Sequence, residues 1–291
     1  MTTSNETELV VVSGASTGMG AATARELASR GFHVLAGVRR ESDADALRAD
    51  GIEPVILDIT NEEHVAALAA RVAPDSEGRR LRILINNAGI SINAPVETLS
   101  LANWRLQFEV NLFGHIAVTQ ALLPSLRANG GRIVNISSVG GKIAMSAYGA
   151  YAGAKFALEA MSDALRRELA HLGVQVVVVE PGAVQTEMAG RGIKAAQEFT
   201  DAMTPDQRAI YGDLMTAVIN QASTFTAHGV PAEEAALVIA EAATTATPQT
   251  RYTIGEEAAA MAKMSRTLSD EQLDAALAQN LAPFFPQQDA S

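Results

Sequence analysis

Short runs of apolar and β-branched residues alternate along the chain with longer stretches whose apolar residues recur every three or four positions. The short runs are continuous, which is typical of strands covered on both faces. They lie at residues 9–13, 34–37, 55–57, 83–86, 132–137, 174–180 and 251–254. The stretches with helical spacing include residues 21–30, 62–72, 104–126 and 152–171, and the alanine-rich tracts at 232–247 and 256–263 also fit helices.

This order of strands and helices predicts an α/β protein. We expect a Rossmann-like, doubly wound, mostly parallel sheet of seven strands with helices on both faces. Such sheets bind ligands beyond the carboxyl ends of their strands. Functional residues are therefore sought at strand ends.

The composition narrows the possible classes of function. The 291 residues are 48% hydrophobic and 19% charged, so we expect one large core and a single domain over 1–291. The net charge of −11 repels nucleic acid and anionic membranes, and neither is an expected partner. The chain has no cysteine, which excludes disulfides and thiolate chemistry, and its five histidines lack metal-ligand spacing. No metal is expected.

The N-terminal residues 1–8 are polar and lack the pattern of a signal peptide. No stretch approaches the ~18 consecutive apolar residues of a membrane span. Together with the absence of cysteine, these features favour a cytoplasmic protein.

A glycine-rich turn joins the first predicted strand to the first helix. It reads Ser13-Gly14-Ala15-Ser16-Thr17-Gly18-Met19-Gly20. Glycines permit a positive φ, a close approach of a ligand and tight packing of helix on strand. A pyrophosphate would then bind at the N-terminus of the helix. The turn predicts a dinucleotide site, although any tight strand-to-helix turn can recruit glycine.

Tyr151 and Lys155 are four residues apart on a predicted helix, so their side chains share a face. Lowering the pKa of a tyrosine by about three units requires roughly 4 kcal/mol, and an ammonium about 4 Å away supplies roughly that amount. Ser138 ends a neighbouring strand and can donate to a substrate oxygen. The spacing alone equally fits a packed tyrosine beside a lysine that reaches solvent.

Further motifs accompany this pair. The chain carries, in order, the turn at 14–20, Asp58, Asn86-Asn87-Ala88-Gly89, Asn111, Ser138, Tyr151-x-x-x-Lys155 and Pro181-Gly182-x-Val184-x-Thr186. This series resembles the short-chain dehydrogenase/reductase family over about residues 8–190, with a weaker match at 251–255. One departure is Ser13, where the family usually has threonine.

The resemblance implies an NAD(P)-dependent oxidoreductase that interconverts a secondary alcohol and a ketone or aldehyde. Tyr151 would be the acid-base residue, Ser138 would hold the substrate oxygen, and Lys155 would bind the nicotinamide ribose and lower the tyrosine pKa. Asn111 would anchor a water in a proton relay. Ser137 and Tyr148 receive no role, and Lys142 is expected to be a loop residue without one.

The predicted cofactor contacts extend over the whole series. They are Gly14, Ser16, Thr17, Gly18, Met19, Gly20, Arg39, Asp58, Ile59, Asn87, Ala88, Gly89, Tyr151, Lys155, Pro181, Gly182, Val184 and Thr186. By the resemblance, Asp58 would bind the adenine amine and Thr186 the nicotinamide carboxamide. The same residue types are also common in strand-end turns and caps.

The end of the second strand indicates which cofactor is used. Gly37 takes the usual place of an acidic residue that would bind a ribose 2′-hydroxyl, while Arg39 and Arg40 offer donors for a 2′-phosphate. Thr17 stands where some NADP-dependent relatives have a basic residue. We expect NADP, with NAD as the alternative.

The resemblance implies that residues 187–230 cover the substrate. Their many apolar side chains are compatible with a lipophilic alcohol or ketone. These side chains fit equally well a segment that only covers the edge of the sheet and binds no substrate.

Two alternative functions are a non-catalytic dinucleotide sensor and an epimerase or dehydratase of the same superfamily. By the resemblance we expect a homodimer or homotetramer that pairs through the helices at 104–126 and 152–171.

Overall fold

The computed structural model describes residues 8–73 and 78–287. Seven strands form one parallel sheet in the order β3-β2-β1-β4-β5-β6-β9. The strands are β1 (Leu9–Val12), β2 (His33–Val38), β3 (Ile52–Ile56), β4 (Leu81–Asn86), β5 (Arg132–Ile136), β6 (Gln175–Pro181) and β9 (Arg251–Ile254). All seven predicted runs are therefore strands, and the predicted fold class is confirmed.

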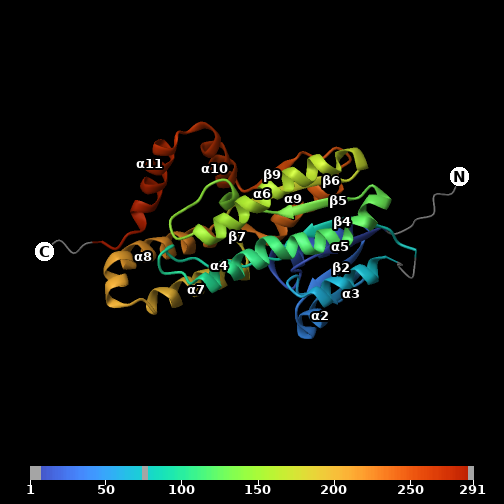
Figure 1. Cartoon of the computed structure of the whole chain (residues 1–291), viewed down its shortest axis with the longest axis horizontal. Helices are drawn as coiled ribbons and strands as arrows, with labels where there is room; N and C mark the ends of the chain where they lie inside the picture. Colours follow the sequence, from blue (N-terminus) through green and yellow to red (C-terminus); the bar gives the residue numbers. More distant parts are fainter. Residues whose placement is uncertain (1–7, 74–77, 288–291) are drawn as a thin grey trace.

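Helices cover both faces of this sheet (Figure 1). The α-helices of the described residues are α1 (Gly18–Ser29), α2 (Glu41–Leu47), α3 (Glu62–Val72), α4 (Leu101–Phe108), α5 (Gly114–Asn129), α6 (Gly149–Leu169), α7 (Glu187–Asp201), α8 (Pro205–Ala227), α9 (Ala232–Thr244), α10 (Glu256–Thr267) and α11 (Asp270–Leu281). In β1, Val10 and Val12 pack with α1 and α9, whereas Leu9 and Val11 pack with α3 and α5. Both faces of the strand are buried, which explains its continuous apolar sequence.

The helix predicted at 104–126 is interrupted. A π-helical turn, η1 (Glu109–Phe113), separates α4 from α5. Asn111 lies in this turn, and its side chain bonds the backbone of Ile90 rather than solvent. Single π-helical turns are frequently found at functional sites. The apolar periodicity of the sequence does not predict this turn.

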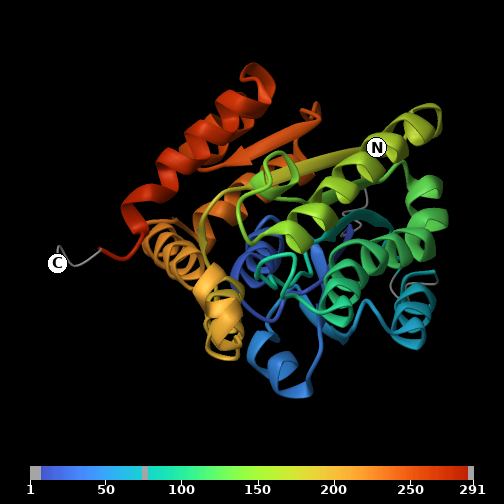
Figure 2. The same cartoon turned by 60° about the vertical axis from the view of Figure 1, so that its left-hand side comes forward.

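The segment predicted to cover the substrate is helical. Thr204 and Gln207 form a reciprocal cap at the start of α8, with Pro205 at the first helical position. Two short parallel strands, β7 (Val184–Gln185) and β8 (Val230–Pro231), join the two ends of this segment. In Figures 1 and 2, α7, α8, α10 and α11 gather at one end of the molecule.

Over residues 8–73 and 78–287, no helix combines the length and the apolar character needed to cross a bilayer. The polar N-terminus that was interpreted as lacking a signal peptide lies, apart from residue 8, outside the described residues.

Candidate active site

A cavity of about 380 Å³ opens at the carboxyl ends of the parallel strands. This volume lies within the range of small-molecule sites. Every residue predicted to contact the cofactor or to act in catalysis lines it, from Gly14 in the first turn to Thr186 after β6. Residues of α7, α8 and α10 complete its wall. The fold thus brings the predicted residues together from eight separate segments.

The glycine turn lies against the end of β4. Gly14 has φ +64°, and a Cβ there would approach the Ala88 Cα to 2.6 Å. A Cβ on Gly20 would lie 2.3 Å from the Gly14 carbonyl oxygen. Both positions therefore require glycine. Because Thr17 provides no side-chain cap for α1, the first amide N–H groups of that helix remain available to an anion. The turn thus fits a pyrophosphate.

Ser13 holds this turn to the neighbouring strand end. Its hydroxyl accepts hydrogen bonds from the backbone N–H groups of Asn87 (3.0 Å) and Ala88 (3.1 Å). The Asn87 side chain returns two bonds, to the carbonyls of Ser13 and Gly14 at 3.0 Å each. A serine therefore provides the hydroxyl contacts at the position where the resembled family usually has threonine.

The two arginines after β2 have different environments. Arg39 is exposed and lines the cavity together with Asp58 and Ile59. Arg40 turns away and binds the Asp43 carboxylate through two contacts of 2.9 and 2.8 Å. Burial pushes the pKa of Asp58 upward, but hydrogen bonds from Thr60 outweigh it and the pKa lies below its usual value. Asp58 is thus a carboxylate at the cavity wall.

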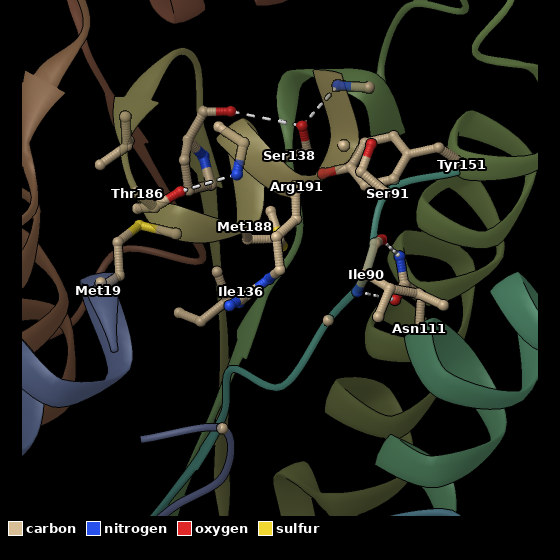
Figure 3. Close-up of a pocket in the computed structure, with 18 of the residues that line it drawn as sticks. Met19, Ile90, Ser91, Asn111, Ile136, Ser138, Tyr151, Thr186, Met188 and Arg191 are labelled. Carbon is tan, nitrogen blue, oxygen red and sulfur yellow. Dashed lines mark hydrogen bonds between the residues drawn. The ribbon is translucent and has the colours of Figure 1, made fainter. Parts of the chain in front are cut away.

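Ser138 and Tyr151 come together on one side of the cavity (Figure 3). Ser138 lies at the end of β5, where its hydroxyl accepts from the Gly140 N–H at 3.0 Å. Tyr151 is 9% exposed in the first turn of α6. The Lys155 Nζ lies 5.9 Å from the centre of the Tyr151 ring and donates to the Ile136 carbonyl at 2.8 Å.

The electrostatics of Tyr151 differ from the prediction. Burial raises the pKa of the Tyr151 phenol above its usual value, and the hydrogen bond with Ser138 acts in the opposite direction. The predicted lowering of this pKa is therefore wrong for this structure, because desolvation of the buried phenolate is the largest effect on it. The pKa of Lys155 is itself lowered by burial, to about 8.

Asn111 is fully buried behind this group. Its Oδ1 accepts from the Ile90 N–H and its Nδ2 donates to the Ile90 carbonyl, both at 2.9 Å (Figure 3). The side chain thus fastens η1 to the loop after β4. A relay role for Asn111 stays a prediction.

The segment after β6 closes the cavity opposite α6. The Pro181 carbonyl lies 3.5 Å from the Ser138 hydroxyl, and the Gly182 N–H donates to the Ile254 carbonyl at 3.0 Å. Val184 belongs to β7, and Thr186 caps α7 by accepting from the Ala189 N–H. A Cβ on Gly18 would lie 3.1 Å from the Thr186 side chain, so the two ends of the site approach each other closely.

Sequence reasoning missed several residues of the cavity. Tyr148 and Ser137 were given no role, yet both line it, and the Tyr148 ring meets the Tyr151 ring edge-on at 6.2 Å. Burial raises the pKa of Tyr148 to about 12. Ser91 and Arg191 were also missed, because no spacing connects them to the motifs.

Lys142 does lie in a loop, after a short turn, but it is not without partners. Its ammonium contacts Glu159 at 2.7 Å and Glu180 at 3.4 Å. In the part of the chain that the structure describes, no group of three or more histidine or acidic side chains is arranged to hold a metal ion.

Comparisons with known proteins agree with this architecture. The family model for short chain dehydrogenase matches residues 8–197. A 3-amino-tetrahydro-pyrrolizinone reductase from Xenorhabdus hominickii is 35% identical, and the match covers 91% of this chain and 93% of that protein. Human retinol dehydrogenase 16 is 40% identical over 72% of this chain and 67% of its own length.

A solved structure is also similar over nearly its whole length. It is a short-chain dehydrogenase from Burkholderia cenocepacia in complex with NADP, with a TM-score of 0.72 and 29% identity, and the match covers 94% of this chain and 98% of that one. The matched family region contains every predicted site residue, and the similarity of fold extends beyond it. The chain is therefore a member of the short-chain dehydrogenase/reductase family and an oxidoreductase.

Proposed function

We propose that this protein is an NADP-dependent oxidoreductase that interconverts a lipophilic secondary alcohol and its ketone or aldehyde. The observation that carries the proposal is the convergence of Ser138, Tyr151 and Lys155 on one cavity that also contains the glycine turn. A dinucleotide-binding protein without catalysis has no need of these three side chains.

The glycine turn, Asp58 and the backbone at Asn87–Gly89 would hold the adenosine and pyrophosphate parts of the cofactor. When bound, the reduced nicotinamide supplies a hydride to the carbonyl carbon. Ser138 donates a hydrogen bond to the carbonyl oxygen, which stabilises the charge that develops there. Tyr151 then transfers its phenolic proton to that oxygen, and a new C–H and O–H bond result.

The raised pKa of Tyr151 favours this direction at neutral pH. A phenol whose pKa lies above its usual value keeps its proton, so it is ready to act as an acid in ketone reduction. Lys155 is the nearby cation that would stabilise the phenolate left after transfer. In alcohol oxidation the same groups act in reverse, with Tyr151 as the base.

The wall contributed by α7, α8 and α10 supports a lipophilic substrate. It presents mostly apolar side chains to the cavity, among them Met188, Ile193, Val218, Phe225 and Met261. Such walls bind substrates chiefly by burying apolar surface. The names of two relatives, a retinol dehydrogenase and a pyrrolizinone reductase, are compatible with this class.

The proposal also includes the choice of cofactor and the pairing of two copies of the chain. Arg39 on the cavity wall supports NADP, because a guanidinium can bind a 2′-phosphate. The apolar side chains of Phe113 on η1 and Phe156 on α6 are 52% and 44% exposed, which supports pairing of two copies through this side of the molecule.

The decisive test is the variant Tyr151→Phe. We expect it to abolish turnover with a panel of apolar ketones and alcohols while its affinity for NADPH stays within about twofold, because only the proton-transferring oxygen is removed. Absorbance of the nicotinamide reports turnover, and fluorescence titration reports binding. Retained activity would contradict the catalytic assignment. No turnover in the native protein would favour a sensor, and substrate conversion without net cofactor change would favour an epimerase.

A further inference from the structure

Four ionisable side chains follow one face of α6 at intervals of four residues. They are Tyr151, Lys155, Glu159 and Asp163. Residues with this spacing are neighbours on a helix. Lys155 is 4% exposed and Glu159 is 5% exposed, whereas the Asp163 side chain is 28% exposed. The line therefore runs along one face of α6, from the candidate active site through buried positions to the partly exposed Asp163.

Burial works against the charge on Lys155. It lowers the pKa of the ammonium to about 8, and Glu159 acts in the opposite direction. His115 on α5 also faces Lys155, but burial lowers its pKa to about 3, so it is neutral. Tyr151 is protonated at neutral pH because burial raises its pKa. Of the described groups that act on Lys155, Glu159 alone carries a negative charge.

Two cations from other elements of the fold bind the Glu159 carboxylate. Its Oε2 accepts from the Lys142 Nζ at 2.7 Å and from two nitrogens of Arg251 at 3.0 and 3.1 Å. Its Oε1 has no hydrogen-bond partner in the structure. The cations offset the cost of burying the carboxylate. They come from the loop after β5 and from β9, so three elements fix its position.

Glu180 shares these two cations but differs from Glu159. It is 1% exposed on β6 and contacts Arg251 at 3.0 Å. Burial, and then the neighbouring Glu159, raise the pKa of Glu180. Glu180, Asp163 and Arg251 also line a second, polar cavity of about 810 Å³, whereas Glu159 does not. Glu159 therefore contacts two cations of this cavity's wall, Lys142 and Arg251, without lining the cavity itself.

We propose that Glu159 is a positioning residue whose carboxylate keeps Lys155 in the ammonium form. The inference deepens the proposed function, because that function needs a cation beside Tyr151. It also gives Lys142 and Arg251 a part, since they hold the carboxylate that acts on Lys155. The proposal predicts the charge state of Lys155, and this can be measured without an assay of enzyme activity.

The test uses the small number of lysines. The chain has four, at 142, 155, 194 and 263, so NMR of the full-length protein labelled with ¹³C at lysine Cε gives a spectrum in which each signal can be assigned by substitution. Titration of the Lys155 signal reports its pKa directly. We expect a value of about 8 in the native protein. In Glu159→Gln we expect it to fall by about one unit, the effect of losing a nearby opposite charge.

The matched control is Asp163→Asn, which removes the same charge one turn farther along α6 and also loses a contact with Arg251. It should leave the Lys155 titration unchanged. Since Glu159→Gln leaves two cations with fewer partners, the comparison is repeated in the Lys142→Gln background, where adding Glu159→Gln should lower the Lys155 pKa again. An unchanged Lys155 titration in that comparison, or a native pKa below 7, would overturn the inference. If instead the shift appears but Tyr151→Phe retains activity, the proposed function fails and the electrostatic inference stands.

Discussion

Arg39 and Arg40 are adjacent in the chain, yet only one of them faces the candidate active site. Arg39 lines the cavity, while Arg40 is engaged by Asp43 at the start of α2. This difference cannot be inferred from the sequence Arg39-Arg40, because both side chains are equally suited to a phosphate. Their separation makes Arg40 a natural control for the proposed role of Arg39.

We expect Arg39→Ala to weaken NADPH binding about tenfold and to leave NADH binding nearly unchanged. A charge-assisted hydrogen bond contributes about 1.5–3 kcal/mol, and the exposure of Arg39 places its effect at the lower end. Fluorescence titration with both cofactors measures the change. Arg40→Ala should affect neither affinity. Equal losses in both variants, or tighter binding of NADH by the native protein, would argue against NADP as the cofactor.

At the scale of single residues, chemistry at strand ends could be predicted and remote partners could not. Tyr151 and Lys155 are recognisable by their spacing on a helix, and the glycine turn by its place after a strand. Lys142 contacts Glu159 and Glu180, which lie 17 and 38 positions away, and Arg251, which contacts the same two carboxylates, lies 109 positions away. No local pattern connects these residues. The burial of Tyr151 was also not predicted from the sequence. It raises the pKa of this tyrosine, whereas a lowering was expected.

At the scale of elements, the end of the chain supports a wall of the cavity. Phe284 follows α11 and meets Phe225 of α8 edge-on, with the ring centres 6.0 Å apart. Leu281 is buried against Ala217 and Val218 on the same helix. The Asn220 and Gln221 side chains also donate to carbonyls of this C-terminal segment. The position of α8 therefore depends on residues 281–284.

Phe284→Ala should loosen α8 without disturbing the cofactor end of the site. Loss of the aromatic pair costs about 1 kcal/mol, which lowers Tm by roughly 2 °C in a chain of this size. We expect faster amide hydrogen exchange in α8 and a higher KM for apolar substrates, with unchanged NADPH affinity. The neighbouring Phe285 is 42% exposed, so Phe285→Ala provides the control. Equal exchange in α8 for both variants would show that the aromatic contact does not hold the helix.

Periodicity predicted most elements because most of them bury an apolar face. The strands and the long helices follow that rule, as the burial of β1 on both faces illustrates. The helix α2 was missed because its seven residues include few apolar ones, and only Ala44 and Leu47 are buried. The π-helical turn was missed because no apolar pattern marks it, and the Asn111 side chain within it bonds the backbone of Ile90, 21 positions away. Two-residue strands such as β7 are too short to produce a pattern.

At the scale of the whole molecule, exposed apolar side chains occur on elements that cover each face of the sheet. Phe113 and Phe156 lie on η1 and α6, where Phe108 packs directly on Gly153. Leu237 is 51% exposed on α9, which covers the other face of the sheet. The two sides thus offer matched positions for testing where copies of the chain meet.

We expect the native protein to be a dimer or tetramer in solution and Phe156→Glu to shift it toward smaller species at micromolar concentration. A buried charge without a partner opposes association. Size-exclusion chromatography with light scattering measures the mass. Leu237→Glu should leave the assembly intact. A native protein that is monomeric throughout, or a Phe156→Glu variant with native mass, would contradict pairing through α5 and α6.

The cavity draws its walls from distant parts of the chain. The first turn supplies Gly14 to Gly20, whereas Met261 comes from α10 and Phe284, which follows α11, contacts Phe225 of α8. During translation the glycine turn and its sheet neighbours emerge long before these segments. A nascent chain can therefore form much of the dinucleotide end while its substrate end is still open. Phe284 can support the α8 wall through its contact with Phe225 only after it has left the ribosome.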